Sequence, residues 1–144
     1  MHIVKCCEQK SIPNYKHKDD NGKKMRAEII AGKLYNQKAT SPPPNSWAVD
    51  KKNEVAVWNI KMQSNAQLNL PKASAGINRT LYFYMGESIT VCRQKVPRYD
   101  AVEVTPEFDI NIQNANHKLR ILVLQGKPIN ENIIQYGPFI MNSK

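Results

Sequence analysis

Short stretches in which apolar and polar residues alternate recur along most of the chain, and they constrain its fold more than any other feature. A clear example is EVAVWNIKM, residues 54–62. Successive side chains of a β-strand point to opposite faces of the sheet, so this alternation predicts a half-buried strand. The further stretches that predict strands in this way are 25–33, 80–86, 100–106, 108–114 and 118–126.

The same alternation predicts which side chains of each strand are buried. In residues 54–62 the apolar face would carry Ala56, Trp58, Ile60 and Met62. In residues 80–86 it would carry Leu81, Phe83 and Met85, with Tyr82 and Tyr84 opposite, and in residues 108–114 it would carry Phe108, Ile110 and Ile112. The stretch 118–126 is apolar on both faces through Leu122 and Leu124, which predicts a strand deeper in the protein.

Turn-forming residues separate these stretches, and no stretch shows a helical spacing of apolar residues over more than about two turns. The clearest turn signals are Asp20-Asn21-Gly22, the proline run 42–44, Gly86, Pro97 and Pro106. Many short strands with regular turns predict an all-β sandwich or barrel. Residues 41–53 are expected to form a loop, which Trp47 anchors to the protein.

Length and composition favour one globular domain in the cytoplasm. The chain has 144 residues, enough for a single core, and charged residues make up an ordinary 23%. No apolar run approaches the length of a membrane span, and the first ten residues do not resemble a secretory signal. The three cysteines are an odd number and two of them are adjacent, which favours a reducing compartment over a disulfide framework.

The chain is basic, with a formal net charge of +9. The excess is densest in KHKDDNGKKMR, residues 16–26. A nucleic-acid surface is one interpretation of such a cluster. An ordinary solvated face is the interpretation that we favour, because no aromatic residues are interleaved with these lysines to stack on bases. Nucleic acid is therefore not favoured as a partner.

A catalytic or metal site is not visible in the sequence. The three histidines, His2, His17 and His117, lie far apart, and none belongs to a pair with metal-ligand spacing. The chain also lacks a nucleophile elbow and a phosphate-binding loop. We therefore expect no metal, no cofactor and no catalytic residue.

The C-terminal residues carry a family resemblance. Residues 121–143, ILVLQGKPINENIIQYGPFIMNS, resemble the end of the C-terminal domain of the pirin family. Residues 23–71 and 78–91 are similar to the earlier strands of that domain, so the resemblance covers roughly residues 11–143. The residues of the signature turn, to which we assign a structural or interface role, are Tyr136, Gly137, Pro138, Phe139 and Asn142.

The resemblance implies a fold and an origin from a longer protein. Pirins are bicupins, in which two jelly-roll β-sandwiches share one chain. The N-terminal cupin holds a metal, usually iron, through three histidines and a glutamate. Some bacterial members are quercetin 2,3-dioxygenases, and other members are described as nuclear co-regulators. The resemblance implies that this chain is a truncated bicupin, with an extension at residues 1–10 and a C-terminal-type cupin at residues 11–144.

The chain departs from the metal-binding pattern of cupins. Where the first cupin motif has histidines, this sequence has Asn78, Arg79 and Thr80. The region of the second motif, residues 105–114, contains no histidine. Neutral amide and hydroxyl groups would not hold Fe(II) against water. The resemblance therefore transfers the fold to this chain without the metal chemistry.

Three functions follow from these observations. The leading expectation is a non-catalytic interaction module, and the first alternative is a quercetinase-like dioxygenase with an unconventional metal site or with metal from a partner cupin. The second alternative is a nucleic-acid binder that uses the basic surface. We expect a homodimer, or a complex with another cupin, through the sheet face near Trp58 and the turn at Phe139. A small-molecule cavity would be lined by Trp58, Arg79, Tyr82 and Tyr84, although core packing is favoured for all of these except Arg79.

Overall fold

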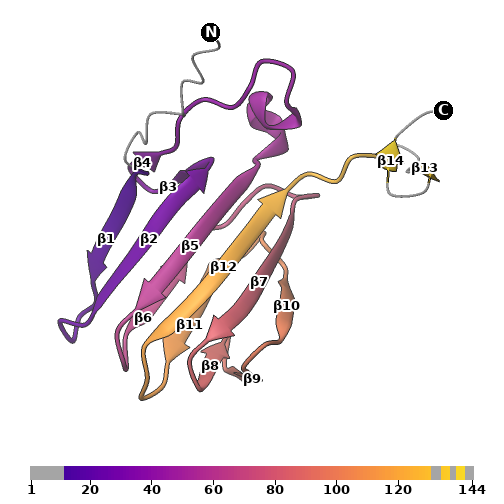
Figure 1. The fold of residues 1–144 in the computed structure, drawn as a ribbon. Coiled ribbons are helices and arrows are strands. Elements are labelled where there is room, and N and C mark those ends of the chain that lie inside the picture. Colours follow the sequence, from indigo (N-terminus) through magenta and orange to yellow (C-terminus); the bar gives the residue numbers. More distant parts are fainter. Residues whose placement is uncertain (1–11, 131–133, 137–138, 142–144) are drawn as a thin grey trace, which may run out of the picture.

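The structure is a computed structural model that describes residues 12–130, 134–136 and 139–141. Two antiparallel sheets form its two layers (Figure 1). The larger sheet has the order β1-β2-β5-β12-β7-β10, and the smaller sheet has the order β6-β11-β8-β9. The strands of the larger sheet are β1 (Asn14–Lys18), β2 (Lys24–Ala31), β5 (Ala56–Met62), β7 (Asn78–Met85), β10 (Ala101–Val104) and β12 (Leu119–Gly126).

The remaining elements are shorter. The smaller sheet contains β6 (Gln67–Leu70), β8 (Ser88–Val91), β9 (Gln94–Pro97) and β11 (Ile110–Asn114). Two short hairpins and two 3-10 turns complete the structure: β3 (Lys33–Leu34) with β4 (Gln37–Lys38), β13 (Ile134–Tyr136) with β14 (Phe139–Met141), η1 (Trp47–Val49) and η2 (Lys51–Asn53). In the described part of the chain, no helix has the length and apolar character needed to cross a membrane.

The chain alternates between the two layers. It runs from β5 to β6, β7, β8 and β9, β10, β11 and β12, and nearly every step passes from one sheet to the other. Strands that are distant in sequence therefore pair, as β12 does with β5 and β7 and as β11 does with β6 and β8. This arrangement is a jelly roll, which confirms the all-β prediction.

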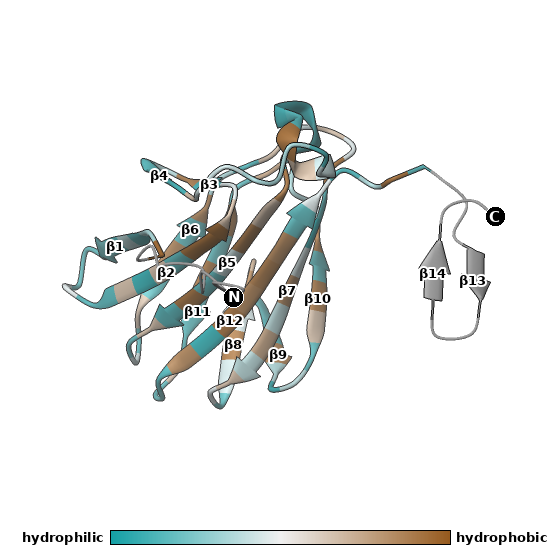
Figure 2. Cartoon of the chain, turned by 45° about the horizontal axis from the view of Figure 1, so that its top comes forward, coloured by the Kyte–Doolittle hydropathy of each residue, from teal (hydrophilic) through white to brown (hydrophobic). Residues whose placement is uncertain are grey.

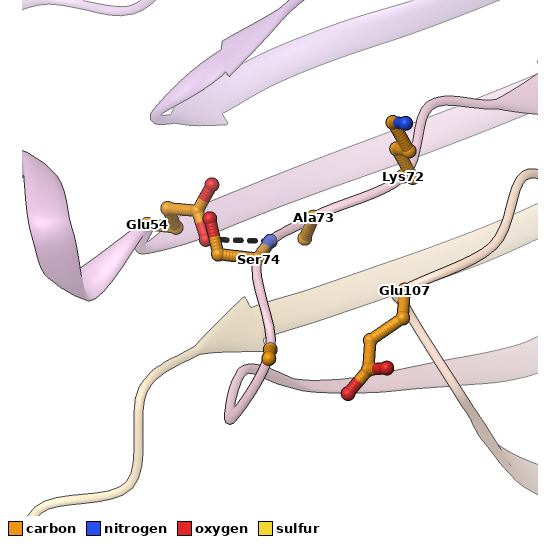
Figure 3. A pocket seen from close by; sticks show the side chains of 6 residues that line it. Glu54, Lys72, Ala73, Ser74 and Glu107 are labelled. Atoms are coloured by element: carbon orange, nitrogen blue, oxygen red, sulfur yellow. Dashed lines mark hydrogen bonds between the residues drawn. The ribbon is translucent and has the colours of Figure 1, made fainter.

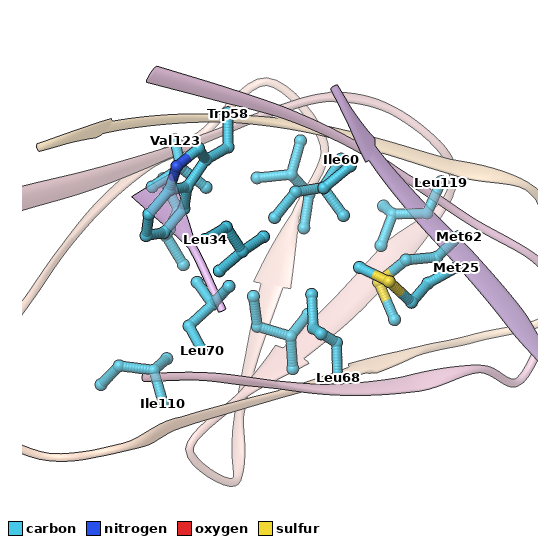
Figure 4. Packing of buried hydrophobic residues seen from close by; sticks show 14 of the residues in the cluster. Met25, Leu34, Trp58, Ile60, Met62, Leu68, Leu70, Ile110, Leu119 and Val123 are labelled. Atoms are coloured by element: carbon cyan, nitrogen blue, oxygen red, sulfur yellow. The ribbon is translucent and has the colours of Figure 1, made fainter. Parts of the chain in front are cut away.

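The core lies between the sheets and follows the predicted alternation. Every second residue of β5 is buried, from Ala56 to Met62. The buried residues of β12 alternate in the same way, and β12 lies between β5 and β7 inside the larger sheet. Figure 4 shows side chains from both layers filling the space between them, with Trp58 and Ile60 on one side and Leu68 and Leu70 on the other.

Two residues that we expected inside are exposed. Met85 is 43% exposed because a β-bulge between Arg120 and Ile121 shifts the register of β12 against the end of β7. Phe108 is 68% exposed because it lies in the turn that precedes β11, whose first residue is Ile110. In both cases the alternation of apolar residues continues past the regular strand pairing.

Two of the predicted segments lie partly or wholly outside the described residues. The extension at residues 1–10 is one of them. In the signature turn, the backbones of Tyr136 and Phe139 lie opposite each other in the β13–β14 pair. Residues 137, 138 and 142 and the side chains of this hairpin are outside the described part.

Candidate functional site

The interior of the jelly roll is filled with apolar side chains. Many of the apolar residues that face inward on its central strands are less than 5% exposed, and they include Trp58, Ile60, Leu81, Phe83, Ile110, Ile112, Leu119, Ile121 and Val123. A metal in this place would need imidazole, thiolate or carboxylate ligands, and none of these side chains supplies one. The iron that pirins hold in their N-terminal cupin therefore does not fit the residues of this interior.

The potential metal ligands of the described chain are dispersed. No group of three or more His, Cys, Asp and Glu side chains converges among residues 12–130. His17 is an exposed residue of β1. His117 lies in the loop between β11 and β12, where its Nε2 is 3.0 Å from Glu87 Oε2, and both side chains are more than 60% exposed. His2 is outside the described residues.

Arg79 is a charged residue in the interior, and Asn53 and Asn114 are further buried polar residues of the described chain. Only 2% of Arg79 is exposed, and it lies opposite Gln125 where β7 pairs with β12. Its Nε donates to Gln125 Oε1 at 2.8 Å, and its Nη2 donates to the backbone oxygen of Pro71 at 2.8 Å. The guanidinium carbon is 5.6 Å from the centre of the Trp58 ring, a cation–π distance.

Arg79 is held as a buried cation by neutral partners. Burial lowers the pKa of Arg79, and the negative charges of Glu54 and Asp109 partly oppose this effect. An arginine side chain nevertheless remains protonated in proteins. Within the described chain, Arg79 Nη1 and Trp58 Nε1 have no hydrogen-bond partner. Arg79 therefore fixes the loop that begins at Pro71 without being fully satisfied itself.

The four residues predicted to line a cavity do not lie on one surface. Trp58 and Arg79 lie together in the interior. Tyr82 and Tyr84 lie on the outer face of the larger sheet, where they are 41% and 38% exposed. Because β7 alternates between the two faces, its tyrosines cannot share a cavity with Arg79, Leu81 and Phe83.

The sheet face near Trp58 also differs from the expectation. Trp58 itself points into the core and is 1% exposed, so it cannot contribute to an outer interface. The outward residues of β5 beside it are Val57 and Asn59, which are partly exposed. Any partner on this face would therefore contact Val57 and Asn59 in place of the indole.

A shallow hollow lies at the end of the jelly roll where the loop 71–76 runs. Its volume is about 420 Å³, and its walls are formed by Glu54, Glu107 and residues 72–75 (Figure 3). The backbone N–H of Ser74 donates to Glu54 Oε2 at 3.0 Å, so one of the two carboxylates holds the loop. No sequence motif predicts this hollow, because its two glutamates are 53 positions apart.

A polar network crosses the outer face of the larger sheet. Tyr84 Oη donates to Asn59 Oδ1 at 2.6 Å, and Asn59 Nδ2 donates to Glu28 Oε2 at 3.0 Å. Lys61 Nζ is 3.1 Å from Glu28 Oε1, and Arg26 Nη2 is 3.9 Å from the same oxygen. Hydrogen bonds from Lys61 and Asn59 lower the pKa of Glu28. Residues of three strands, β2, β5 and β7, are thereby joined on one exposed face.

Together, the jelly-roll topology and the packed interior define a single cupin-type domain without a convergent set of metal ligands among its described residues. Residues 57–144 match the pirin C-terminal cupin domain. The chain therefore belongs to the pirin family through this C-terminal type of domain.

Relatives of known sequence agree with this assignment. A Pirin-like protein of Solanum lycopersicum is 34% identical over 70 residues, which are 46% of this chain and 24% of that protein. A candidate quercetin 2,3-dioxygenase of Pseudomonas aeruginosa is 35% identical over 77 residues, which are 51% of this chain and 26% of that protein. The chain spans about a quarter of the length of these two relatives.

Solved structures show the same fold. The crystal structure of a quercetin 2,3-dioxygenase from Acinetobacter baumannii superimposes with a TM-score of 0.71 at 25% identity, covering 95% of this chain and 43% of that one. A predicted oxalate decarboxylase from Thermotoga maritima superimposes with a TM-score of 0.55 at 13% identity, covering 82% of this chain and 95% of that one. The second similarity concerns the fold alone.

Proposed function

We propose that this domain is a non-catalytic cupin that works as an interaction module. The observation that carries the proposal is the chemistry of the inward-facing positions. On β5, β7, β11 and β12 these positions hold apolar side chains, apart from the Arg79–Gln125 pair at one end and Asn114 at the end of β11. A cupin enzyme needs metal ligands and an open coordination position at its centre. In this domain, packed apolar side chains occupy the place where a cupin enzyme has its metal ligands.

The outer face of the larger sheet supports the interaction role. Large apolar side chains are exposed on it, including Tyr82, Tyr84 and Leu124. The network from Tyr84 to Glu28 fixes polar side chains beside them. A surface that combines exposed aromatic residues with positioned polar groups is suited to binding a partner. We place the working surface of the domain there.

The alternative function is dioxygenase activity that needs a second cupin. The names of several relatives favour it, since the Pseudomonas aeruginosa protein is a candidate quercetin 2,3-dioxygenase. In that case a partner cupin would supply the metal, and this domain would stabilise or shape the complex. Our proposal and this alternative differ in whether complexes that contain the domain bind a metal and oxidise quercetin.

Metal analysis and a quercetin assay separate the two functions when they are run on the domain alone and on the domain mixed with a metal-loaded cupin, because only the alternative predicts that the domain raises turnover in the mixture. The purified domain is incubated with Fe(II), Ni(II), Cu(II) or Zn(II), passed through a desalting column and analysed for metal, and quercetin oxidation is followed by absorbance. The Acinetobacter baumannii enzyme serves as the positive control. We expect no stoichiometric metal and no turnover. One bound metal per chain together with quercetin turnover would contradict the non-catalytic role.

A further inference from the structure

A row of four basic residues crosses the outer face of the larger sheet. Lys16 of β1 lies opposite Arg26 of β2, Arg26 lies opposite Lys61 of β5, and Lys61 lies opposite Arg120 of β12. Residues that lie directly opposite each other in antiparallel strands share one face. At the usual spacing of strands, this row is about 14 Å long. A second pair, Lys18 opposite Lys24, continues it toward the end of the β1–β2 hairpin.

Stability does not explain this arrangement. Like charges that lie directly opposite each other destabilise a sheet. Glu28 contacts two of the cations, Arg26 at 3.9 Å and Lys61 at 3.1 Å. Among the described residues, the other four form no ion pair: Lys16, Lys18, Lys24 and Arg120. We therefore expect this excess of positive charge to bind an anionic ligand.

Aromatic side chains lie beside the row on the same face. Leu122 of β12 lies between Asn59 of β5 and Tyr82 of β7. Tyr82 and Tyr84 are 41% and 38% exposed, and Tyr84 is tied to the basic row through Asn59. Figure 1 shows β5, β12 and β7 as adjacent strands of one continuous sheet. The face thus combines a line of cations with aromatic rings and apolar side chains.

We propose that this cationic and aromatic face binds single-stranded nucleic acid. Basic side chains neutralise phosphates, and exposed aromatic rings stack on bases that a single strand leaves free. A duplex would present its phosphates but not its base faces, and an acidic peptide would not use the rings for stacking. The inference rests on the proposed role as an interaction module and names the partner class for that surface.

Fluorescence anisotropy with labelled oligonucleotides tests the proposal. The probes are a 20-nucleotide oligo(dT), the corresponding oligo(U), a 20-base-pair duplex and poly-glutamate of equal charge. The test variant combines Lys16→Glu with Arg120→Glu, and the control variant combines Lys51→Glu with Lys52→Glu. The control changes the net charge equally, but its two exposed lysines lie on η2, outside the face.

We expect the single-stranded probes to bind most tightly. The test variant should weaken this binding by roughly 30-fold, and it should reduce the slope of log affinity against log salt by about 0.7 for each lost phosphate contact. The control variant should stay within about threefold of the unchanged protein. Tyr82→Ala should weaken single-strand binding by roughly 5- to 100-fold, which corresponds to the loss of one stacked base, and it should leave duplex binding nearly unchanged.

Several outcomes would overturn the proposal. Equal losses in the test and control variants would assign the binding to diffuse net charge. Tighter binding of the duplex or of poly-glutamate would assign the face to another class of partner. Thermal unfolding of each variant checks folding, and both variants should stay folded because all four changed residues are exposed. A failure here leaves the metal and quercetin result intact, so it is distinguishable from a failure of the proposed function.

Discussion

Gly32 is a residue whose backbone and surroundings both require glycine. It follows β2 with a φ of +76°, and a Cβ atom built on it would lie 2.4 Å from the backbone oxygen of Val55 and 2.9 Å from Ala56. Gly32→Ala should therefore lower the free energy of unfolding by about 3 kcal/mol, through left-handed strain and overpacking together. Urea unfolding followed by circular dichroism measures this loss.

Gly22 provides the matched control. Its φ is +75°, but a Cβ atom there would meet no atom within 4 Å. Gly22→Ala should cost only the conformational strain, about 1 kcal/mol. Equal losses in the two variants would show that the close approach of Gly32 to β5 contributes nothing.

The carboxylate of Glu28 should make stability depend on pH in the acidic range. Hydrogen bonds from Lys61 and Asn59 lower its pKa below the ordinary value of 4.5, so the folded state holds the charged form more strongly than the unfolded state does. This contribution is present above the unfolded pKa and is lost as pH falls through the lower folded pKa. Glu28→Gln should therefore be less stable than the unchanged protein by about 1 kcal/mol at pH 7, because the side chain is one-quarter exposed.

The pH series is the decisive measurement for Glu28. Urea unfolding is repeated at intervals between pH 7 and pH 3. The difference between Glu28→Gln and the unchanged protein should shrink as the carboxylate becomes protonated in both states. A difference that stays constant over this range would mean that the network acts through its shape and not through the charge of Glu28.

Single residues also mark the limit of prediction from sequence. The alternation in residues 80–86 separates Tyr82 and Tyr84 from Leu81 and Phe83, and the structure has this separation. The prediction of one cavity lined by Trp58, Arg79 and both tyrosines did not take this alternation into account. The structure places the tyrosines on the outer face of the sheet and the other two residues in the interior. Trp47 agrees with the prediction of a loop anchor, because its Nε1 donates to the backbone oxygen of Lys127 at 3.1 Å. That partner is 80 positions away and could not be named from the sequence.

At the scale of elements, Arg79 ties β7 to the loop that follows β6. Its guanidinium reaches both Gln125 and the backbone oxygen of Pro71. Arg79→Lys keeps the charge but loses the fork that serves both acceptors, so it should destabilise the domain by about 2 kcal/mol. Hydrogen exchange of the amides of residues 72–76 should become faster, and urea unfolding gives the loss of stability.

Arg98 offers a control of the same residue type. It is exposed, and its guanidinium carbon lies 4.7 Å from the centre of the Tyr99 ring. Arg98→Lys should change stability by no more than about 0.5 kcal/mol and leave exchange in residues 72–76 unchanged. If Arg79→Lys were equally harmless, the buried guanidinium would not anchor the loop.

The strands differ in how well the sequence predicted them. β5 and β12 have long alternating stretches because they lie side by side inside the larger sheet, with one face in the core. β1, NYKHK, shows no such alternation because it is an edge strand with one neighbour, and only Tyr15 packs against the core. Figure 2 shows this difference, with β1 mostly hydrophilic and β12 banded with hydrophobic residues. Edge strands have less apolar surface to bury, so they leave a weaker pattern.

At the scale of the whole molecule, the jelly-roll topology creates surfaces that no sequence window contains. The basic residues of 16–26 have no aromatic residues among them, which argued against base stacking. Because β5 and β12 lie between β2 and β7, the fold adds Lys61, Arg120, Tyr82 and Tyr84 to the same face. Local alternation predicts which side chains of a strand face outward, but the composition of this face also depends on strand order, which local alternation does not give.

The expectation of a homodimer stays a prediction. It can be tested through the outer face of the larger sheet. Its apolar part contains Val57, Leu122 and Leu124, and Leu124 is 38% exposed. If two copies pack through this part, their basic rows approach each other and repel. Salt shortens the range of this repulsion from about 10 Å at 0.1 M to about 3 Å at 1 M. Self-association should therefore strengthen with salt, whereas binding of nucleic acid should weaken.

Light scattering at high micromolar concentration, in 0.05 M and 1 M salt, measures this self-association. We expect a larger average mass in 1 M salt, and Leu122→Lys should abolish the increase because it places a further charge in the apolar part. Lys52→Gln, on η2, is the control that should leave the increase unchanged. A monomer at both salt concentrations would contradict pairing through this face. Association that weakens with salt would place the contact on another surface, where opposite charges attract.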